Sequence, residues 1–168
     1  MTRRLATIAA VAFSAGFTAA VNADAKADDA PTGAPISVWL SPGIYSRHFD
    51  RSKNFREDNV GPGIEVSLAQ DHMLMAGSFI NSIRARTHYA AYQWRPLHWQ
   101  IAGAKVSAGV AAGVFDGYPH YHNGGVFAAA LPLLAVEGDR LGVNLSIVPT
   151  IRDRLAGAFA IQFELRAW

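Results

Sequence analysis

The chain has 168 residues, with 15 basic and 13 acidic side chains and no cysteine. This length suffices for one domain, and nothing in the composition indicates a second. The first 23 residues carry two of the arginines and no acid, so the remainder is balanced at 13 basic against 13 acidic residues. The charge therefore does not indicate a nucleic-acid-binding protein, and the stability cannot come from disulfide bonds.

Residues 1–23 have the pattern of an export signal. Arg3 and Arg4 precede an uncharged apolar run that extends from Leu5 to Val21, and residues 21–23 are small enough for a cleavage site. Because the run is rich in alanine and contains Ser, Thr and Gly, a cleaved signal peptide is favoured over a retained membrane helix. Residues 24–35 are polar and contain Pro and Gly, so they are predicted to form a flexible leader.

Residues 36–168 are predicted to form one β-barrel domain. Apolar and polar residues alternate with a period of two, which is typical of half-exposed strands. Eight such segments are predicted, at residues 36–49, 61–70, 73–82, 86–95, 98–114, 125–137, 141–150 and 157–167. A soluble barrel would turn the apolar face of each strand inward, whereas a membrane barrel would turn it toward lipid.

Three asymmetries favour the membrane barrel, and the first two concern the connections and the aromatic residues. Long polar connections (50–60, 83–85, 115–124, 151–156) alternate with tight ones (71–72, 96–97, 138–140), as in barrels with one outer and one periplasmic rim. An up-and-down order places the tryptophans (Trp39, Trp94, Trp99, Trp168) at the tight-turn rim and other aromatic residues (Tyr45, Phe49, Phe115, Tyr118, Tyr121) at the long-loop rim. The predicted fold is therefore an all-β, eight-stranded antiparallel up-and-down transmembrane barrel in the outer membrane.

The long-loop rim also collects basic residues. Arg47, Arg84 and Arg86 belong to this group and are predicted to bind the phosphorylated head groups of lipids. Charged loops that are simply solvated are an equally good interpretation of the same residues.

Three polar residues at this rim form a candidate catalytic group. His48 closes the first segment, and Asn81 and Ser82 close the third, so strands running the same way would bring them to one rim. Acyl transfer needs a proton acceptor and donors for an oxyanion, and these side chains could supply both. The alternative is that all three are ordinary rim residues.

Proline and glycine residues suggest where a lipid chain could be held. Pro132 and Pro149 lie inside otherwise regular strands, where the missing N–H would interrupt pairing and open the wall locally. Gly103 and Gly109 are predicted to line the lumen and to leave room for one acyl chain. A bulge without lipid traffic is the alternative interpretation of the prolines.

Short motifs resemble the outer-membrane lipid A palmitoyltransferases, the PagP family. They are residues 79–82 (Phe-Ile-Asn-Ser), 92–97 (Tyr-Gln-Trp-Arg-Pro-Leu), 131–136 (Leu-Pro-Leu-Leu-Ala-Val) and 147–149 (Ile-Val-Pro), with His48 at the position of the family's first-strand histidine. The resemblance extends from about Pro42 to Trp168. It implies a monomeric barrel, without cofactor or metal, that moves a palmitoyl chain from a phospholipid to the lipid A of lipopolysaccharide.

The chain departs from this family in two respects. Asn81 stands where the family has aspartate, and an amide cannot supply the negative charge that stabilises an imidazolium. Residues 24–35 are also too short and polar for the family's amphipathic helix. A non-catalytic outer-membrane barrel and a soluble periplasmic lipid-binding barrel therefore remain alternatives.

Overall fold

A computed structural model describes residues 36–151 and 155–168, in which the chain forms eight strands. The strands are β1 (Val38–His48), β2 (Asp58–Ala69), β3 (His72–Ile80), β4 (Arg86–Ile101), β5 (Ala104–Phe115), β6 (Phe127–Glu137), β7 (Leu141–Val148) and β8 (Ala158–Arg166). The predicted signal peptide and leader lie outside the described residues. Over the two described ranges, no helix is long and apolar enough to cross a membrane.

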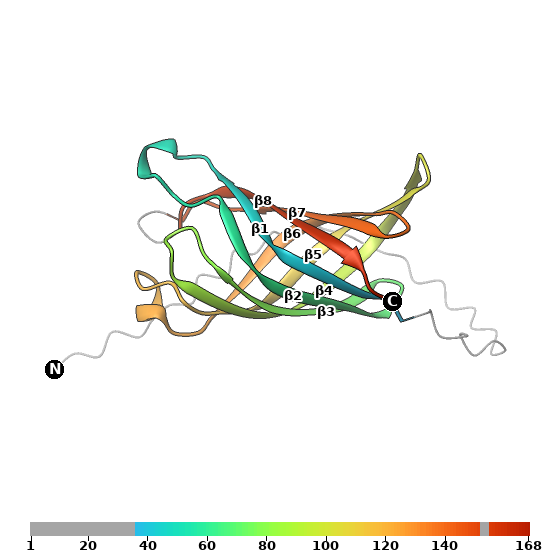
Figure 1. Cartoon of the computed structure of the whole chain (residues 1–168), viewed down its shortest axis with the longest axis horizontal. Coiled ribbons are helices and arrows are strands. Elements are labelled where there is room, and N and C mark those ends of the chain that lie inside the picture. The colour runs from blue at the N-terminus through green and yellow to red at the C-terminus, as the bar shows by residue number, and fades with distance from the viewer. Residues whose placement is uncertain (1–35, 152–154) are drawn as a thin grey trace, which may run out of the picture. The chain divides into compact units, whose positions relative to one another are not determined.

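The strands form a closed antiparallel barrel in which each pairs with its neighbours in the chain (Figure 1). The barrel closes where β1 pairs with β8, from Trp39 opposite Arg166 to His48 opposite Ala158. Two short 3-10 turns, η1 (Arg51–Lys53) and η2 (His122–Gly124), lie in the long loops. The predicted all-β, eight-stranded up-and-down barrel is confirmed.

The barrel exposes apolar side chains and encloses polar ones. Large apolar residues on the outer faces of the strands are exposed, among them Leu40, Ile64, Leu74, Trp94, Val110, Phe159 and Phe163. Charged or amide side chains on the inner faces are buried, among them Glu65, Gln93, Arg95, Glu137, Asn144 and Glu164. This arrangement is the inverse of a soluble barrel, in which apolar residues fill the centre.

The half of the lumen nearer the tight turns is filled by a charged network. Arg95 donates to Glu137 at 2.8 Å and lies 3.6 Å from Glu65, and all three side chains are buried. Asn144 donates to both Glu65 and Glu164, which ties β7 to β2 and β8. Buried charges are tolerated only when they are paired and hydrogen-bonded in this way.

Aromatic rings occupy the half of the lumen nearer the long loops. The ring centroids of neighbouring residues lie 5.8 Å apart for Phe79 and Tyr89, 6.1 Å for Tyr89 and Phe115, and 6.0 Å for Phe115 and Phe127. Tyr118 and Tyr121 pack against the edge of Phe127 from the loop that follows β5. Of the aromatic residues predicted at the outside of this rim, only Tyr45 and Phe49 are exposed there.

The predicted boundary between the fourth and fifth strands is wrong. Pro96 and Leu97 do not form a turn, because β4 continues through them to Ile101 and only its register with β5 shifts between Trp94 and Leu97. The turn lies at Ala102 and Gly103, which both have positive φ angles. Two residues with positive φ match the twist of a tight hairpin. Pro96 lies instead at a local bulge, which lets the strand continue past it.

The prediction of four tryptophans around the tight-turn rim also needs correction. Trp94, Trp99 and Trp168 are exposed, but Trp39 is only 1% exposed and lies inside the barrel. The guanidinium of Arg166 lies 4.4 Å from the centre of the Trp39 ring. Trp39 therefore belongs to the lumen filling, where its ring stacks under a cation.

Candidate functional site at the long-loop rim

His48 lies at the end of β1 and faces the lumen. Its side chain is buried and packs on Phe55 from the following loop, with ring centroids 4.5 Å apart. Its Nδ1 atom is buried and has no hydrogen-bond partner among the described residues. A buried imidazole nitrogen left unpaired costs free energy, so it is a position where function rather than packing can explain the residue.

Ser82 belongs to a chain of polar side chains that crosses the rim. Its hydroxyl lies 3.2 Å from the hydroxyl of Ser46, and Asn59 donates to Ser46 at 2.8 Å. Ser46 precedes His48 by two residues on the inner face of β1, so both point to the same side of the wall. The rim thus gathers one imidazole, two hydroxyls and one amide.

Asn81 lies beside this group, but its side chain is engaged in hydrogen bonds with its own turn, with β4 and with the loop after β5. The amide oxygen accepts from the backbone N–H groups of Ile83 and Ala85 at 3.1 and 3.0 Å. The amide nitrogen donates to the Thr87 hydroxyl at 3.1 Å and to the Gly117 carbonyl at 2.8 Å. Asn81 is 0% exposed, so it holds the loop after β3 against the loop after β5.

The predicted lipid-binding arginines lie in two separate places. Arg47 faces outward at the end of β1, where Arg47, Arg51 and the Tyr45 hydroxyl all contact the carboxylate of Glu57. These donors, led by the Tyr45 hydroxyl, hold the pKa of Glu57 below its usual range. Arg86 instead donates to Ser78 on β3 at 3.2 Å.

The wall is incompletely paired between β6 and β7. Their pairing extends from Glu137 opposite Gly142 to Leu133 opposite Ser146 and stops there, immediately before Pro132. Pro149 follows the last residue of β7. A groove of about 390 Å³ lies at this place, and it is lined by outward residues and by inward residues such as Leu133, Ser146 and Ala160. Pairing between the two strands thus ends next to Pro132, whereas Pro149, which was predicted inside a strand, lies beyond the end of β7.

The gap lies at the same rim as His48, two strands away from it. His48 pairs with Ala158 of β8, and Ala158 pairs in turn with Val148 at the end of β7. Only the width of β8 therefore separates the imidazole from the strand that borders the gap. The sequence alone did not indicate this neighbourhood, because it depends on how the barrel closes.

The two glycines predicted to leave room for an acyl chain have other tasks. Gly103 lies in the tight turn at the opposite rim, with a φ angle of 85°. Gly109 is on β5 against the bulge of β4, and a methyl group there would lie 2.7 Å from the Cα atom of Arg95. Its small size permits two strands to approach closely and does not create free space.

Two residues of the rim group were missed in the sequence. Ser46 and Asn59 link Ser82 to the surroundings of His48, but both have short polar side chains in alternating segments and give no distinctive signal. Their inward phase was the available clue, because a polar residue facing a barrel interior needs a partner. In the part of the chain that the structure describes, no three acidic or histidine side chains are grouped to hold a metal ion.

The sequence was compared with protein-family models and with curated proteins. No protein-family model matches the chain, and no curated protein matches it. The class that the fold defines is the closed eight-stranded antiparallel barrel with an apolar exterior and an interior that is charged near the tight turns and aromatic near the long loops.

Proposed function

We propose that this protein is an outer-membrane barrel that transfers an acyl chain from a phospholipid to lipid A. Membrane insertion is supported by the inverted distribution of side chains, because exposing so many large apolar residues to water would favour aggregation. A closed barrel satisfies its backbone groups without water, which is the condition for crossing a bilayer with strands. The protein would act as a monomer in the outer leaflet.

In this proposal His48 accepts the proton of the lipid A hydroxyl that attacks the phospholipid ester. The hydroxyl oxygen bonds to the carbonyl carbon of the ester, and the bond from that carbon to the glycerol oxygen breaks. The glycerol oxygen leaves with the proton that His48 had accepted. The hydroxyl groups of Ser82 and Ser46 would donate to the oxyanion of the tetrahedral intermediate. Asn81 contributes by holding the loops in place, since its own hydrogen bonds are all used.

One observation carries this proposal above the alternatives. Among the residues that the structure describes, the buried Nδ1 atom of His48 has no hydrogen-bond partner, and two strands, β8 and β7, separate His48 from the edge where the β6–β7 pairing stops. A lipid in the membrane could pass its chain sideways through the β6–β7 gap and bring its ester to His48. The basic residues of the same rim would bind the phosphate groups of the acceptor.

The test is the mass of lipid A from cells that make the protein or its variants. The wild-type protein should add one acyl chain, His48→Ala should abolish the addition, and Ser82→Ala should reduce it. His120→Ala is the matched control, because His120 is an exposed loop histidine at the same rim. Unchanged acylation by both His48→Ala and Ser82→Ala would contradict the assignment.

A non-catalytic outer-membrane barrel is the second candidate, and it is favoured by the engagement of Asn81. The position that would carry a catalytic acid is instead an anchor of two loops. If the wild-type protein is abundant in the outer membrane but leaves the lipid A mass unchanged, this second function replaces the first. Recovery in the soluble fraction without detergent would remove both.

A further inference from the structure

A second group of reactive side chains lies on the outer face of the wall, away from His48 and Ser82. His88 on β4 faces outward, and its ring Nδ1 lies 3.1 Å from Oδ2 of Asp116, the residue after β5. The backbone N–H of His88 also donates to Oδ1 of the same carboxylate at 2.6 Å. The backbone contact thus fixes the Asp116 carboxylate, whose other oxygen holds the imidazole at Nδ1, as a base in a catalytic triad requires.

The third member is a serine on the neighbouring strand. Ser78 of β3 pairs directly with His88 of β4, and both side chains face outward because Phe79 and Tyr89 beside them face the lumen. Directly opposed residues in an antiparallel pair have Cβ atoms roughly 5 Å apart. His88 lies between Ser78 on one side and Asp116 on the other, since β4 is between β3 and β5 in the barrel.

Charge around these residues suits a nucleophilic serine. The two His88 donors hold the pKa of the Asp116 carboxyl below its usual range, so it stays ionised at neutral pH. An ionised carboxylate at Nδ1 favours the tautomer in which Nδ1 carries the proton, which leaves Nε2 free to accept one. Arg86 donates to the Ser78 hydroxyl oxygen at 3.2 Å and places a positive charge where an oxyanion would form.

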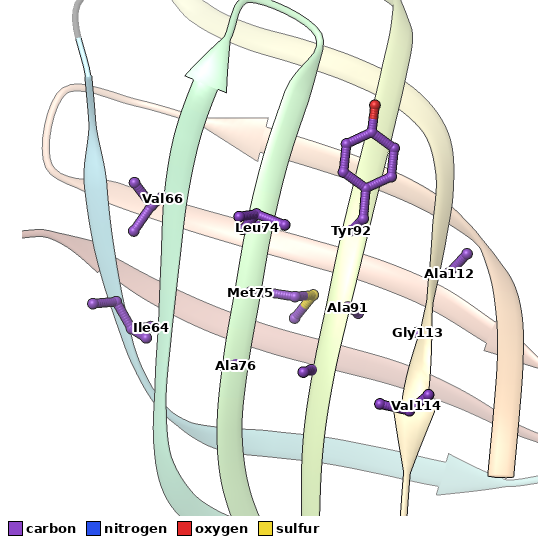
Figure 2. Close-up of a pocket in the computed structure, with 11 residues that line it drawn as sticks. Ile64, Val66, Leu74, Met75, Ala76, Ala91, Tyr92, Ala112, Gly113 and Val114 are labelled. Atoms are coloured by element: carbon purple, nitrogen blue, oxygen red, sulfur yellow. The ribbon is translucent and has the colours of Figure 1, made fainter.

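An apolar groove begins directly next to this group. The next outward pair along the same two strands is Ala76 opposite Ala90, and both residues line a groove of about 490 Å³ on the outer wall. Figure 2 shows the groove crossing β2 to β5, with Ala76 and Val114 nearer the long-loop rim and Leu74 and Tyr92 nearer the hairpin between β2 and β3. Small side chains form its floor and larger ones its borders.

From this geometry we infer that Ser78, His88 and Asp116 form a serine-type site for carboxyl esters whose acyl chain lies in the outer groove. The substrate class follows from the position of the groove, which begins at the residue pair next to Ser78 and His88. An ester bonded at Ser78 would have its chain directed along the apolar wall, past Ala76 and Ala90. The His88 side chain is 63% exposed, so an ester in the surrounding lipid can reach it.

The reaction balances with water as the only co-reactant. The Ser78 hydroxyl oxygen attacks the ester carbon while its proton moves to Nε2 of His88. The bond to the alcohol oxygen breaks, and the alcohol leaves with that proton. Water then attacks the acyl-serine and gives its proton to His88, and the fatty acid leaves as the proton returns to Ser78.

The experiment uses the full-length exported protein, folded in detergent and then in phospholipid vesicles. A fluorophosphonate probe should label the wild-type protein covalently, and Ser78→Ala should not be labelled. Asp116→Asn, which keeps the shape of the side chain, should slow labelling by about 10²-fold. Ser52→Ala is the matched control, because Ser52 is an exposed rim serine whose hydroxyl donates to the Asp50 carboxylate at 2.7 Å.

A further variant tests the groove. Ala90→Phe should fill it beside the serine, so hydrolysis of long-chain esters should fall while that of a butyrate ester is retained.

Labelling that persists in Ser78→Ala, or a wild-type protein that is never labelled, would overturn the inference. Because lipid A acylation is assigned to His48, loss of labelling in Ser78→Ala with unchanged lipid A acylation leaves the proposed function intact. Labelling that depends on Ser78 in a protein that never acylates lipid A would refute only the proposed function.

Discussion

Asn81 illustrates how one side chain can be assigned a role by its partners. An asparagine after a strand, next to a serine, is compatible with catalysis, with a rim position or with a turn. The four hydrogen bonds of its amide decide between these, because they use both donors and two acceptor sites. The residue holds the loop after β3 against the loop after β5.

The substitution Asn81→Asp is expected to destabilise the barrel by about 1–3 kcal/mol. A carboxylate cannot donate to the Gly117 carbonyl or the Thr87 hydroxyl oxygen, so two buried contacts lose their donor. Urea unfolding of the purified barrel measures the effect. Asn54→Asp is the control, because Asn54 is exposed in the loop before β2, and its stability should change by less than about 0.5 kcal/mol. Wild-type stability of Asn81→Asp together with increased lipid A acylation would contradict this role.

At the scale of strands, the glycines are explained by neighbouring atoms that leave no space for a side chain. Gly63 of β2 pairs with Gly77 of β3, and the Tyr89 hydroxyl from β4 lies against both. A methyl group on Gly77 would lie 2.6 Å from the Pro62 carbonyl and 2.7 Å from the Tyr89 hydroxyl. Three strands therefore depend on the absence of a side chain at this point.

Gly77→Ala is accordingly expected to destabilise the barrel by about 1–3 kcal/mol, because the added carbon overpacks the lumen. Gly138→Ala is the matched control, since a methyl group there meets only the Leu141 carbonyl, at 3.4 Å. Thermal unfolding of both variants in the same detergent makes the comparison. Equal stability of the two would mean that the Tyr89 ring moves aside without cost.

The gap between β6 and β7 is also a feature of how whole strands pair. Each strand is fully paired on its other side, β6 with β5 from Glu137 to Phe127 and β7 with β8 up to Val148. The interruption is therefore confined to one edge, and the rest of the wall stays continuous. Pro132 and Pro149 mark it in the sequence, but only the register shows where pairing ends.

At the scale of the whole molecule, the apolar exterior gives the membrane proposal a quantitative test. Val110 is an exposed outward residue near the middle of β5, and Leu141 is an exposed residue at the start of β7. In a bilayer, Val110→Arg should cost about 2–4 kcal/mol, whereas Leu141→Arg should cost about 0–1 kcal/mol. Unfolding from phospholipid vesicles measures both. Equal costs for the two variants would argue against a barrel centred on the bilayer.

The number and order of the strands could be predicted from the sequence because the alternation of apolar and polar residues is local. Each strand carries its own period of two, and tight connections force neighbours to be antiparallel. The turn after β4 was misplaced because Pro96 resembles a turn signal, whereas the bulge beside Gly109 accommodates it within the strand. A turn signal in the local sequence is misleading where a neighbouring strand accommodates the same residue within a bulge.

The sequence by itself determined that this chain alternates between two faces eight times, and that His48 and Ser82 lie at one rim. Only the tertiary structure decided which residues meet across strands. Ser46 beside Ser82, His48 two strands from the β6–β7 gap, and His88 between Ser78 and Asp116 all depend on register and on closure of the barrel. Register is set by pairing along whole strands, and a shift of one residue would turn each of these side chains to the opposite face.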